Sequence, residues 1–302
     1  GTASQKTKFA LGRVGNGTDI VAGPISTFTA IDVGTGSITA PSVSSITTKG
    51  NKKALPTAIA GDFKADVTLN GSGVAVGKPT LTTLKIAGSL NADINVTGIL
   101  KTVTVGTPKG VLDTMDGTLT ADSVGAITVN GNLLGDITIT GNPTVVPFGK
   151  PALNTLKILG VVDAGLLVGG TVDGSNIRVG SSLAAGFVNL VQATNFRNST
   201  FFAGYSGTTT PTAAGFFGGK VTSFKITGTT GSTDAFANSY VIANSLKNVS
   251  LQSVNSSNGA IPFGFYAHEG ITKLTVGKPI TFTYNFGDPD ASILPDFVVK
   301  IV

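Results

Sequence analysis

The side chains with the most potential for chemistry are few, and their spacing limits what they could do. His268 is the only histidine and Glu269 the only glutamate, and they are adjacent in the phrase FYAHEG. Adjacent residues of a strand point to opposite faces, so the two do not form a ready acid-base pair. The chain has no cysteine, and no G-x-S-x-G phrase supports a serine triad built on His268. We therefore expect FYAHEG to be a solvent-facing turn.

Two pairs of aspartates could cleave a polysaccharide, because paired carboxylates are the usual groups for glycoside hydrolysis. They are Asp113 with Asp116 in LDTMDG, and Asp288 with Asp290 in GDPDAS. Aspartates in such phrases also bond their own backbone in turns. We favour the turn interpretation and predict that the protein has no catalytic residues and is not an enzyme.

A recurring phrase indicates how these side chains are positioned. GNLLGDITITG fills residues 131–141, GSLNADINVTG fills 88–98 and GDFKADVTLNG fills 61–71, with a weaker copy, GVVDAGLLVGG, at 160–170. The copies begin 27, 43 and 29 residues apart, which is typical of stacked repeats. Apolar residues alternate with polar ones inside each copy, as in a strand, and the bounding glycines allow sharp corners.

The repeat predicts an all-β fold, a single-stranded parallel β-solenoid that forms one elongated domain over residues 1–302. Residues 1–60 are expected to be a less regular N-terminal part or cap, and 61–302 the repeat region. Asn-Gly dipeptides are frequent and also favour hairpins, so a β-sandwich or barrel is the alternative. The uncovered strand edges at the two ends of a solenoid are templates for pairing. We therefore expect a homo-oligomer or polymer joined through these ends.

Stacked repeats raise the question of a metal. A 27-residue offset would place Asp66 and Asp93 on neighbouring levels, close enough to share a cation, but Gly165 breaks the column in the copy at 160–170. Ca²⁺ needs six to eight oxygen ligands, so corner hydrogen bonding is favoured for these residues. Asp288 and Asp290 are the other candidates for Ca²⁺. We predict no metal and no other cofactor, with Ca²⁺ kept as the alternative.

An aromatic segment interrupts the repeat and predicts a long inserted loop near residues 199–220. It contains Phe201, Phe202, Tyr205, Phe216 and Phe217. These side chains are candidates for a contact surface that stacks on sugars or on a neighbouring subunit. The alternative, which we favour, is that the loop folds over the sheet and buries them in a satellite core.

Composition excludes several classes of partner. The chain has 302 residues, 41% hydrophobic and only 12% charged, with 21 basic residues and a net charge of +5. The basic residues are scattered along the sequence, whereas nucleic-acid binding needs clustered cations. No apolar run reaches the roughly 18 residues of a membrane helix. We predict no nucleic-acid partner and no membrane insertion.

Several phrases resemble a known class of proteins: LKTVTVG, VDGSNIRVGSSL, NSYVIANSLKNVSLQSVNSSNG and the closing PDFVVKIV. They are similar to repeat regions of large secreted and cell-surface proteins from planctomycete-type bacteria, and the similarity is best over 79–302. The resemblance implies a right-handed parallel β-helix, a secreted or cell-surface location and a structural or adhesive role.

These observations predict an extracellular structural protein, a self-assembling building block of a surface layer, filament or adhesive assembly. The alternative is a β-helix that binds or cleaves polysaccharide, and a surface polysaccharide is a second possible partner. A third alternative is a stalk segment of a larger protein.

Overall fold

The computed structural model describes residues 6–51, 53, 58–107, 113–146, 150–159, 171–180, 186–229, 231–255, 258–278 and 281–302. Within them the chain is almost entirely β, with one 3₁₀ helix, η1 (Ala213–Gly215). Twenty-one strands belong to one sheet and five to a second. No helix in this part of the chain has the length and apolar character needed to cross a bilayer.

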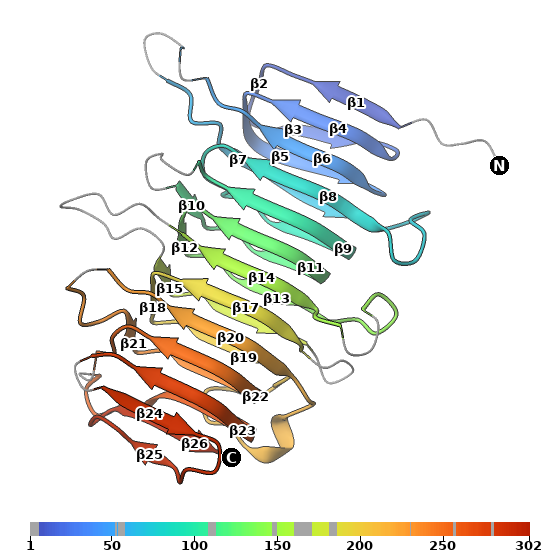
Figure 1. The fold of residues 1–302 in the computed structure, drawn as a ribbon. Helices are drawn as coiled ribbons and strands as arrows, with labels where there is room; N and C mark the ends of the chain where they lie inside the picture. The colour runs from blue at the N-terminus through green and yellow to red at the C-terminus, as the bar shows by residue number, and fades with distance from the viewer. Residues whose placement is uncertain are drawn as a thin grey trace.

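Parallel pairing runs through the molecule as three ladders. Ladder 1 begins with β1 (Thr7–Ala10), β4 (Ile25–Ala30), β6 (Val43–Thr48) and β8 (Pro79–Ile86). It continues through the second halves of β9 (Ile94–Val105) and β11 (Leu119–Val129) to β14 (Leu153–Ile158), β17 (Val188–Ala193) and β20 (Lys220–Ile226). The second halves of β22 (Tyr240–Leu251) and β23 (Phe263–Val276) complete it. Figure 1 shows these strands stacked from the N-terminal to the C-terminal end.

Ladder 2 contains β3 (Thr18–Val21), β5 (Asp32–Ala40), β7 (Phe63–Leu69), the first halves of β9 and β11, β13 (Ile137–Ile139), β16 (Asn176–Val179), β19 (Thr200–Ala203), the first halves of β22 and β23, and β26 (Phe297–Ile301). Ladder 3 is the five-stranded sheet of β10 (Asp113–Met115), β12 (Gly131–Leu133), β15 (Thr171–Asp173), β18 (Asn195–Arg197) and β21 (Phe236–Ala237). β2 (Arg13–Val14) pairs with the start of β5.

The prediction of an open, right-handed parallel β-solenoid is wrong, because the parallel sheet is closed. Strands β9, β11, β22 and β23 are long, and each takes part in both ladder 1 and ladder 2. The sheet therefore closes around the core as a barrel-like wall, and the five-stranded sheet adds further strands. The closure runs around the core, so the outermost strands of the stack still have one unpaired edge among the described residues. Alternation of apolar and polar residues identified strands, but it is the same in open and closed sheets and could not distinguish them.

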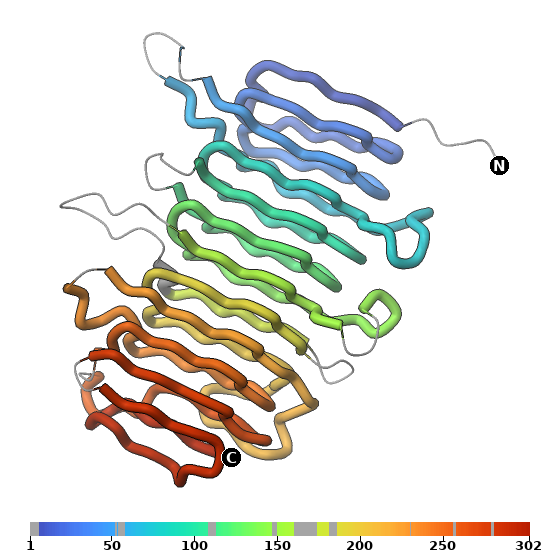
Figure 2. The backbone as a smooth tube through the Cα atoms, in the orientation of Figure 1, coloured from blue at the N-terminus to red at the C-terminus, as the bar shows by residue number. Residues whose placement is uncertain are grey.

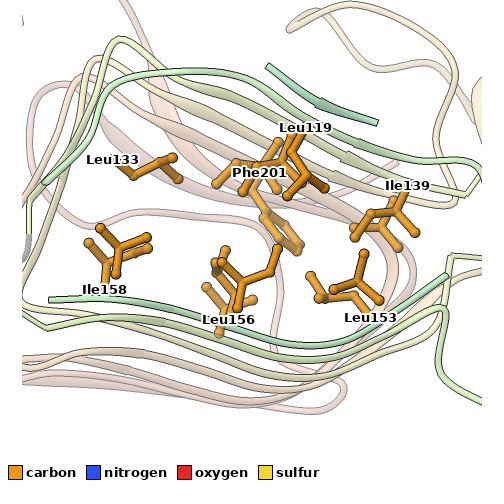
Figure 3. Close-up of a cluster of buried hydrophobic side chains, with 14 of the residues drawn as sticks. Leu119, Leu133, Ile139, Leu153, Leu156, Ile158 and Phe201 are labelled. Atoms are coloured by element: carbon orange, nitrogen blue, oxygen red, sulfur yellow. The ribbon is translucent and has the colours of Figure 1, made fainter. Parts of the chain in front are cut away.

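The core lies inside this wall. In β7 every second residue is buried, with Phe63, Ala65, Val67 and Leu69 pointing inward. Figure 3 shows Leu153, Leu156 and Ile158 of β14 facing Leu119, Leu133 and Ile139 across the interior, with Phe201 between them. The core is mostly aliphatic toward the N-terminus, where Phe28 and Phe63 are also buried, and richer in aromatic residues toward the C-terminus, where it contains seven phenylalanines: Phe196, Phe201, Phe224, Phe236, Phe263, Phe265 and Phe297.

Each recurring phrase forms a corner of the chain. We call one passage of the chain through the ladders a level, and successive levels contact each other at these corners. Phe63, Leu90, Met115 and Leu133 are aligned partners, so the 43-residue interval between two copies contains a further level at residues 113–121. After Leu133 the next aligned residue is Val172, so residues 171–179 form the following level. The weak copy at 160–170 lies outside the described residues. Figure 2 shows how the backbone repeats this path from level to level.

The predicted inserted loop near 199–220 is also corrected. Its first residues form β19, which pairs with β16 on one side and β22 on the other. Only residues 204–219, which we call the flap, leave the ladder, and Tyr205 bridges back to Phe216 in an antiparallel pair. At the N-terminus, β1, β3, β4, β5 and β6 already lie in ladders 1 and 2, so the described part of region 1–60 contributes regular strands.

Candidate functional site

Asp66 and Asp93, the candidates for a shared cation, lie in one column of ladder 2 and bond the backbone of the next level. The carboxylate of Asp66 accepts a hydrogen bond from the backbone amide of Asp93 at 2.9 Å. The carboxylate of Asp93 accepts one from the backbone amide of Thr118, also at 2.9 Å. Asp136 accepts the amide of Asn176 at 2.7 Å in the same way. The described residues contain no group of three or more side chains that could hold a metal ion. This column joins levels of the chain through hydrogen bonds.

Asp288 and Asp290 lie in the segment that follows β24 (Phe282–Asn285), and both bond the backbone. Asp288 accepts the amide of Asn285 at 2.7 Å, and Asp290 accepts the amide of Ile301 at 2.8 Å. The two carboxylates therefore hold the C-terminal strands in place. Their backbone partners are those of turn and capping residues.

Asp113 and Asp116 lie on either side of Thr114 and Met115. Asp113 accepts the amide of Thr107 at 3.3 Å. Burial raises the pKa of the Asp113 carboxyl, the amide of Thr107 lowers it, and the negative charge of Asp62 raises it further. The structure brings Asp113 near the charge of Asp62 in the neighbouring corner, and Asp116 is exposed.

His268 lies within strand β23, not in the turn that we expected, although its side chain is exposed. Its Nδ1 is 2.6 Å from the carbonyl oxygen of Val302, and its ring stacks on Phe216 with 5.4 Å between centroids. The imidazole thus contacts the flap and the last residue of the chain. Glu269 is exposed beside it.

The aromatic candidates for a contact surface are mostly buried. Phe201 belongs to the main core, and Phe202 and Tyr205 belong to a second cluster with Ile242, Tyr266 and Val298 on the outer side of ladder 2. Phe216 is half-buried against this cluster, and only Phe217 is exposed, at 38%. Burial raises the pKa of Tyr266 to about 12. The flap covers the outer side of ladder 2 here, which is the satellite-core arrangement.

Arg178 holds the flap against ladder 2. Its guanidinium donates to the carbonyl oxygens of Tyr205 at 2.7 Å and Gly207 at 3.4 Å, and it lies 4.2 Å from the centroid of Phe202. Burial lowers the pKa of this guanidinium. Hydrogen bonds to a charged group contribute about 1.5–3 kcal/mol, and the cation-π contact adds about 1 kcal/mol.

We expect Arg178→Ala to release the flap without unfolding the rest of the molecule. Chymotrypsin should cut at Phe216 or Phe217 at least about tenfold faster than in the parent protein, because the local opening equilibrium shifts by more than about 1.4 kcal/mol. Arg13→Ala is the matched control, since the Arg13 side chain is 67% exposed in its ion pair with Asp32. Equal cleavage rates in the two variants would show that Arg178 does not hold the flap.

The N-terminal end of the wall presents free strand edges. Strand β1 pairs only with β4, and β3 only with β5, so among the described residues nothing pairs with their other edges. The apolar side chains at this end, Phe9, Val14 and Ile20, are half-buried against the core. Val21 is 82% exposed.

The C-terminal end is closed by antiparallel strands. Strand β24 pairs antiparallel with β23, and β25 (Ala291–Ser292) pairs antiparallel with β26. Tyr284 of β24 is buried, and Ile293 and Leu294 pack against the core from this side. The two ends therefore differ: the outermost strands are parallel to their neighbours at the N-terminal end and antiparallel at the C-terminal end, where β24 and β25 also pair on one side only among the described residues.

Lysines gather on the outer side of ladder 1, and we call this surface the lysine face. It carries eight lysines: Lys8, Lys85, Lys101, Lys157, Lys220, Lys225, Lys247 and Lys273. The strand segments that pair in this ladder contain no aspartate, glutamate or arginine, and their aromatic side chains point inward. Neither ion pair found among the described residues involves a lysine.

The comparisons with known proteins name no relative. No family model matches the chain, and no match is found among curated proteins or solved structures. The resemblance to bacterial surface proteins therefore stays a prediction, and any function must be argued from the site itself.

The lysine face is the feature that sequence reasoning missed. The basic residues look scattered because successive lysines of this face are separated by up to 77 residues of chain, as from Lys8 to Lys85. The strand phrases TLKI and SFKI did indicate that their lysines point outward, because each of these lysines is flanked by inward apolar residues. Alignment of parallel strands brings these positions onto one surface.

Proposed function

We propose that the protein is a non-catalytic structural building block that associates with a second copy of itself through its N-terminal end. The observation that carries this proposal is the free edge of β1 and β3 beside half-buried apolar side chains, whereas antiparallel strands cover the core at the C-terminal end. Free parallel edges with half-covered apolar side chains are templates for strand addition. Pairing of the N-terminal end with the same end of a second copy gives a closed dimer and not an open polymer.

The chain itself supports antiparallel pairing as the mode of association. At the C-terminal end, β24 adds to ladder 1 in antiparallel orientation. A twofold axis at the N-terminal end would place β1 antiparallel to β1 of the second copy, which gives the same kind of pair. Three of the four carboxylates considered for catalysis, those of Asp113, Asp288 and Asp290, accept hydrogen bonds from backbone amides, which supports a structural role for them.

A location outside the cell, in a surface layer or adhesive assembly, belongs to this proposal. It is supported by the absence of cysteine, which suits an oxidising compartment, and by the resemblance to bacterial surface proteins. Binding of polysaccharide is the second candidate function, and the lysine face favours it.

Ala10→Pro tests the proposed association. The amides of Thr7 and Leu11 donate to β4, at 3.0 Å to Pro24 and 2.8 Å to Thr29, so the alternating amide of Ala10 points to the free edge. Proline removes this donor without removing a ladder bond. We expect the parent protein to sediment at twice its 30.3 kDa chain mass, and Ala10→Pro to dissociate at least about tenfold more readily.

Thr283→Pro is the matched control. Phe286 donates to Thr272 at 3.1 Å, so the amide of Thr283 points away from β23 at the capped end. This variant should associate like the parent. A parent protein that is monomeric at all concentrations, or equal weakening by both prolines, would overturn the proposed N-terminal dimer.

A further inference from the structure

The lysine face has the charge and the chemistry of a surface for an extended polyanion, and this goes beyond the proposed self-association. One column of aligned outward residues shows its pattern: Thr29, Thr47, Lys85, Thr104, Thr128, Lys157, Gln192, Lys225, Ser250 and Thr275. Cations alternate with hydroxyl and amide groups, and no carboxylate lies in the strand segments of this ladder. A ligand along this column meets positive charge at intervals and hydrogen-bonding groups in between.

The spacing of the cations indicates which kind of polyanion fits. Three strand spacings separate Lys85 from Lys157, and two separate Lys157 from Lys225, which at about 4.8 Å per strand is about 14 Å and about 10 Å. Duplex DNA carries one charge per about 1.7 Å of its axis, so sparse lysines match it poorly. A polymer with widely spaced carboxylates and many hydroxyl groups matches both features of the column.

The face also lacks the groups that nucleic-acid binding usually employs. Single-stranded nucleic acids stack their bases on exposed aromatic side chains, and phosphates are commonly bound by arginine forks. The strand segments of ladder 1 contain no arginine, and Phe28 and Phe224 are buried in the core. Charge, spacing and side-chain type together favour an acidic polysaccharide.

An open hollow at the side of this face could seat a sugar ring. Its volume is about 480 Å³, and its lining includes Asn154, Phe187, Asn189, Lys220 and Thr222. The amide of Asn189 donates to the side-chain oxygen of Asn154 at 3.2 Å, so the two exposed amides lie side by side. A half-buried aromatic ring beside amide groups suits a polar ligand with an apolar face.

We propose that the lysine face binds an acidic polysaccharide, a polymer whose sugar units carry carboxylates. Lys157 and Lys225 pair with carboxylates, and the hollow at Asn154, Phe187 and Asn189 holds a sugar unit. The chain is bound along the direction in which β14, β17 and β20 stack. Many weak ionic contacts on an exposed surface make this binding sensitive to salt.

Alginate, a polymer of uronic acids, is the probe, and its propylene glycol ester is the matched neutral polymer. We expect the parent protein to bind alginate at 50 mM salt and at least tenfold more weakly at 300 mM, with little binding of the ester. The double variant K157Q/K225Q should bind alginate at least tenfold more weakly. Asn189→Ala should weaken binding severalfold without changing its salt dependence.

The control is K64Q/K300Q, which removes the same charge from two exposed lysines on β7 and β26 of ladder 2. It should bind alginate within twofold of the parent. Equal loss of alginate binding in both double variants would mean that binding depends only on the net charge of the protein. Tighter binding of a single-stranded oligonucleotide than of alginate would mean that the ligand of this face is a nucleic acid. Either result overturns the proposal. Ala10→Pro should bind alginate normally, so failure of the proposed dimer is recognised separately.

Discussion

Phe236→Ala is expected to lower the free energy of unfolding by about 3–5 kcal/mol, as removal of a fully buried phenylalanine does in other cores. Phe236 is completely buried and lies within 6.1 Å, centroid to centroid, of four other rings, those of Phe196, Phe263, Phe265 and Phe297. Rings from ladders 2 and 3 meet at this residue. Its loss leaves a cavity that the surrounding strands cannot close without moving out of register.

Denaturant unfolding followed by circular dichroism measures this loss. Phe286→Ala is the matched control, because Phe286 is 72% exposed on the C-terminal segment, and its removal should change stability by no more than about 0.5 kcal/mol. The loss of unfolding free energy in Phe236→Leu should lie between those of Phe236→Ala and Phe286→Ala. Similar midpoints for Phe236→Ala and Phe286→Ala would mean that the aromatic cluster does not support this end of the molecule.

Gly131→Ala is expected to destabilise the protein by at least about 3 kcal/mol, at the upper end of overpacking effects. A β-carbon at Gly131 would lie 1.7 Å from the carbonyl oxygen of Asp113, a backbone atom of the neighbouring level. Gly131 and Asp113 are aligned partners of β12 and β10, so relief requires the two strands to separate. The added methyl group therefore breaks the corner where levels stack.

Alanine substitutions at two further glycines, Gly88 and Gly23, should cause smaller losses of stability than Gly131→Ala. A β-carbon at Gly88 would meet the Asp62 carboxylate at 2.3 Å, a side chain that can rotate away if it gives up its bond from the Ser89 amide. We expect a smaller loss there, about 1–3 kcal/mol. Gly23 has nothing within 4 Å, so Gly23→Ala should be near neutral. Melting temperatures that do not follow this order would contradict the corner explanation.

The recurring phrases illustrate what sequence reasoning could reach. Their glycines and alternating apolar residues marked true corners and true strands at 61–71, 88–98 and 131–141. The level at 113–121 was overlooked, because Asp113 stands where the other copies have glycine. Aligned residues in successive levels are separated by variable lengths of chain, so a fixed period could not locate it.

The aromatic segment at 199–220 shows a second limit. The sequence identified the five aromatic side chains but could not assign them to sides of a sheet. Phe201 and Phe202 are adjacent in β19, so one enters the core and the other faces outward under the flap. Which neighbour points inward depends on the register with β16 and β22, and that register is set by tertiary pairing.

The sequence by itself determined the strand content, the glycine corners and the inward positions of the apolar residues, because these follow from local alternation and backbone freedom. Only the tertiary structure decided that the parallel sheet closes around the core, that antiparallel strands cover one end, and that eight lysines share one surface. These features depend on which strands become neighbours. Residues far apart in the chain become adjacent only through pairing, and alternation within a strand carries no record of the partner.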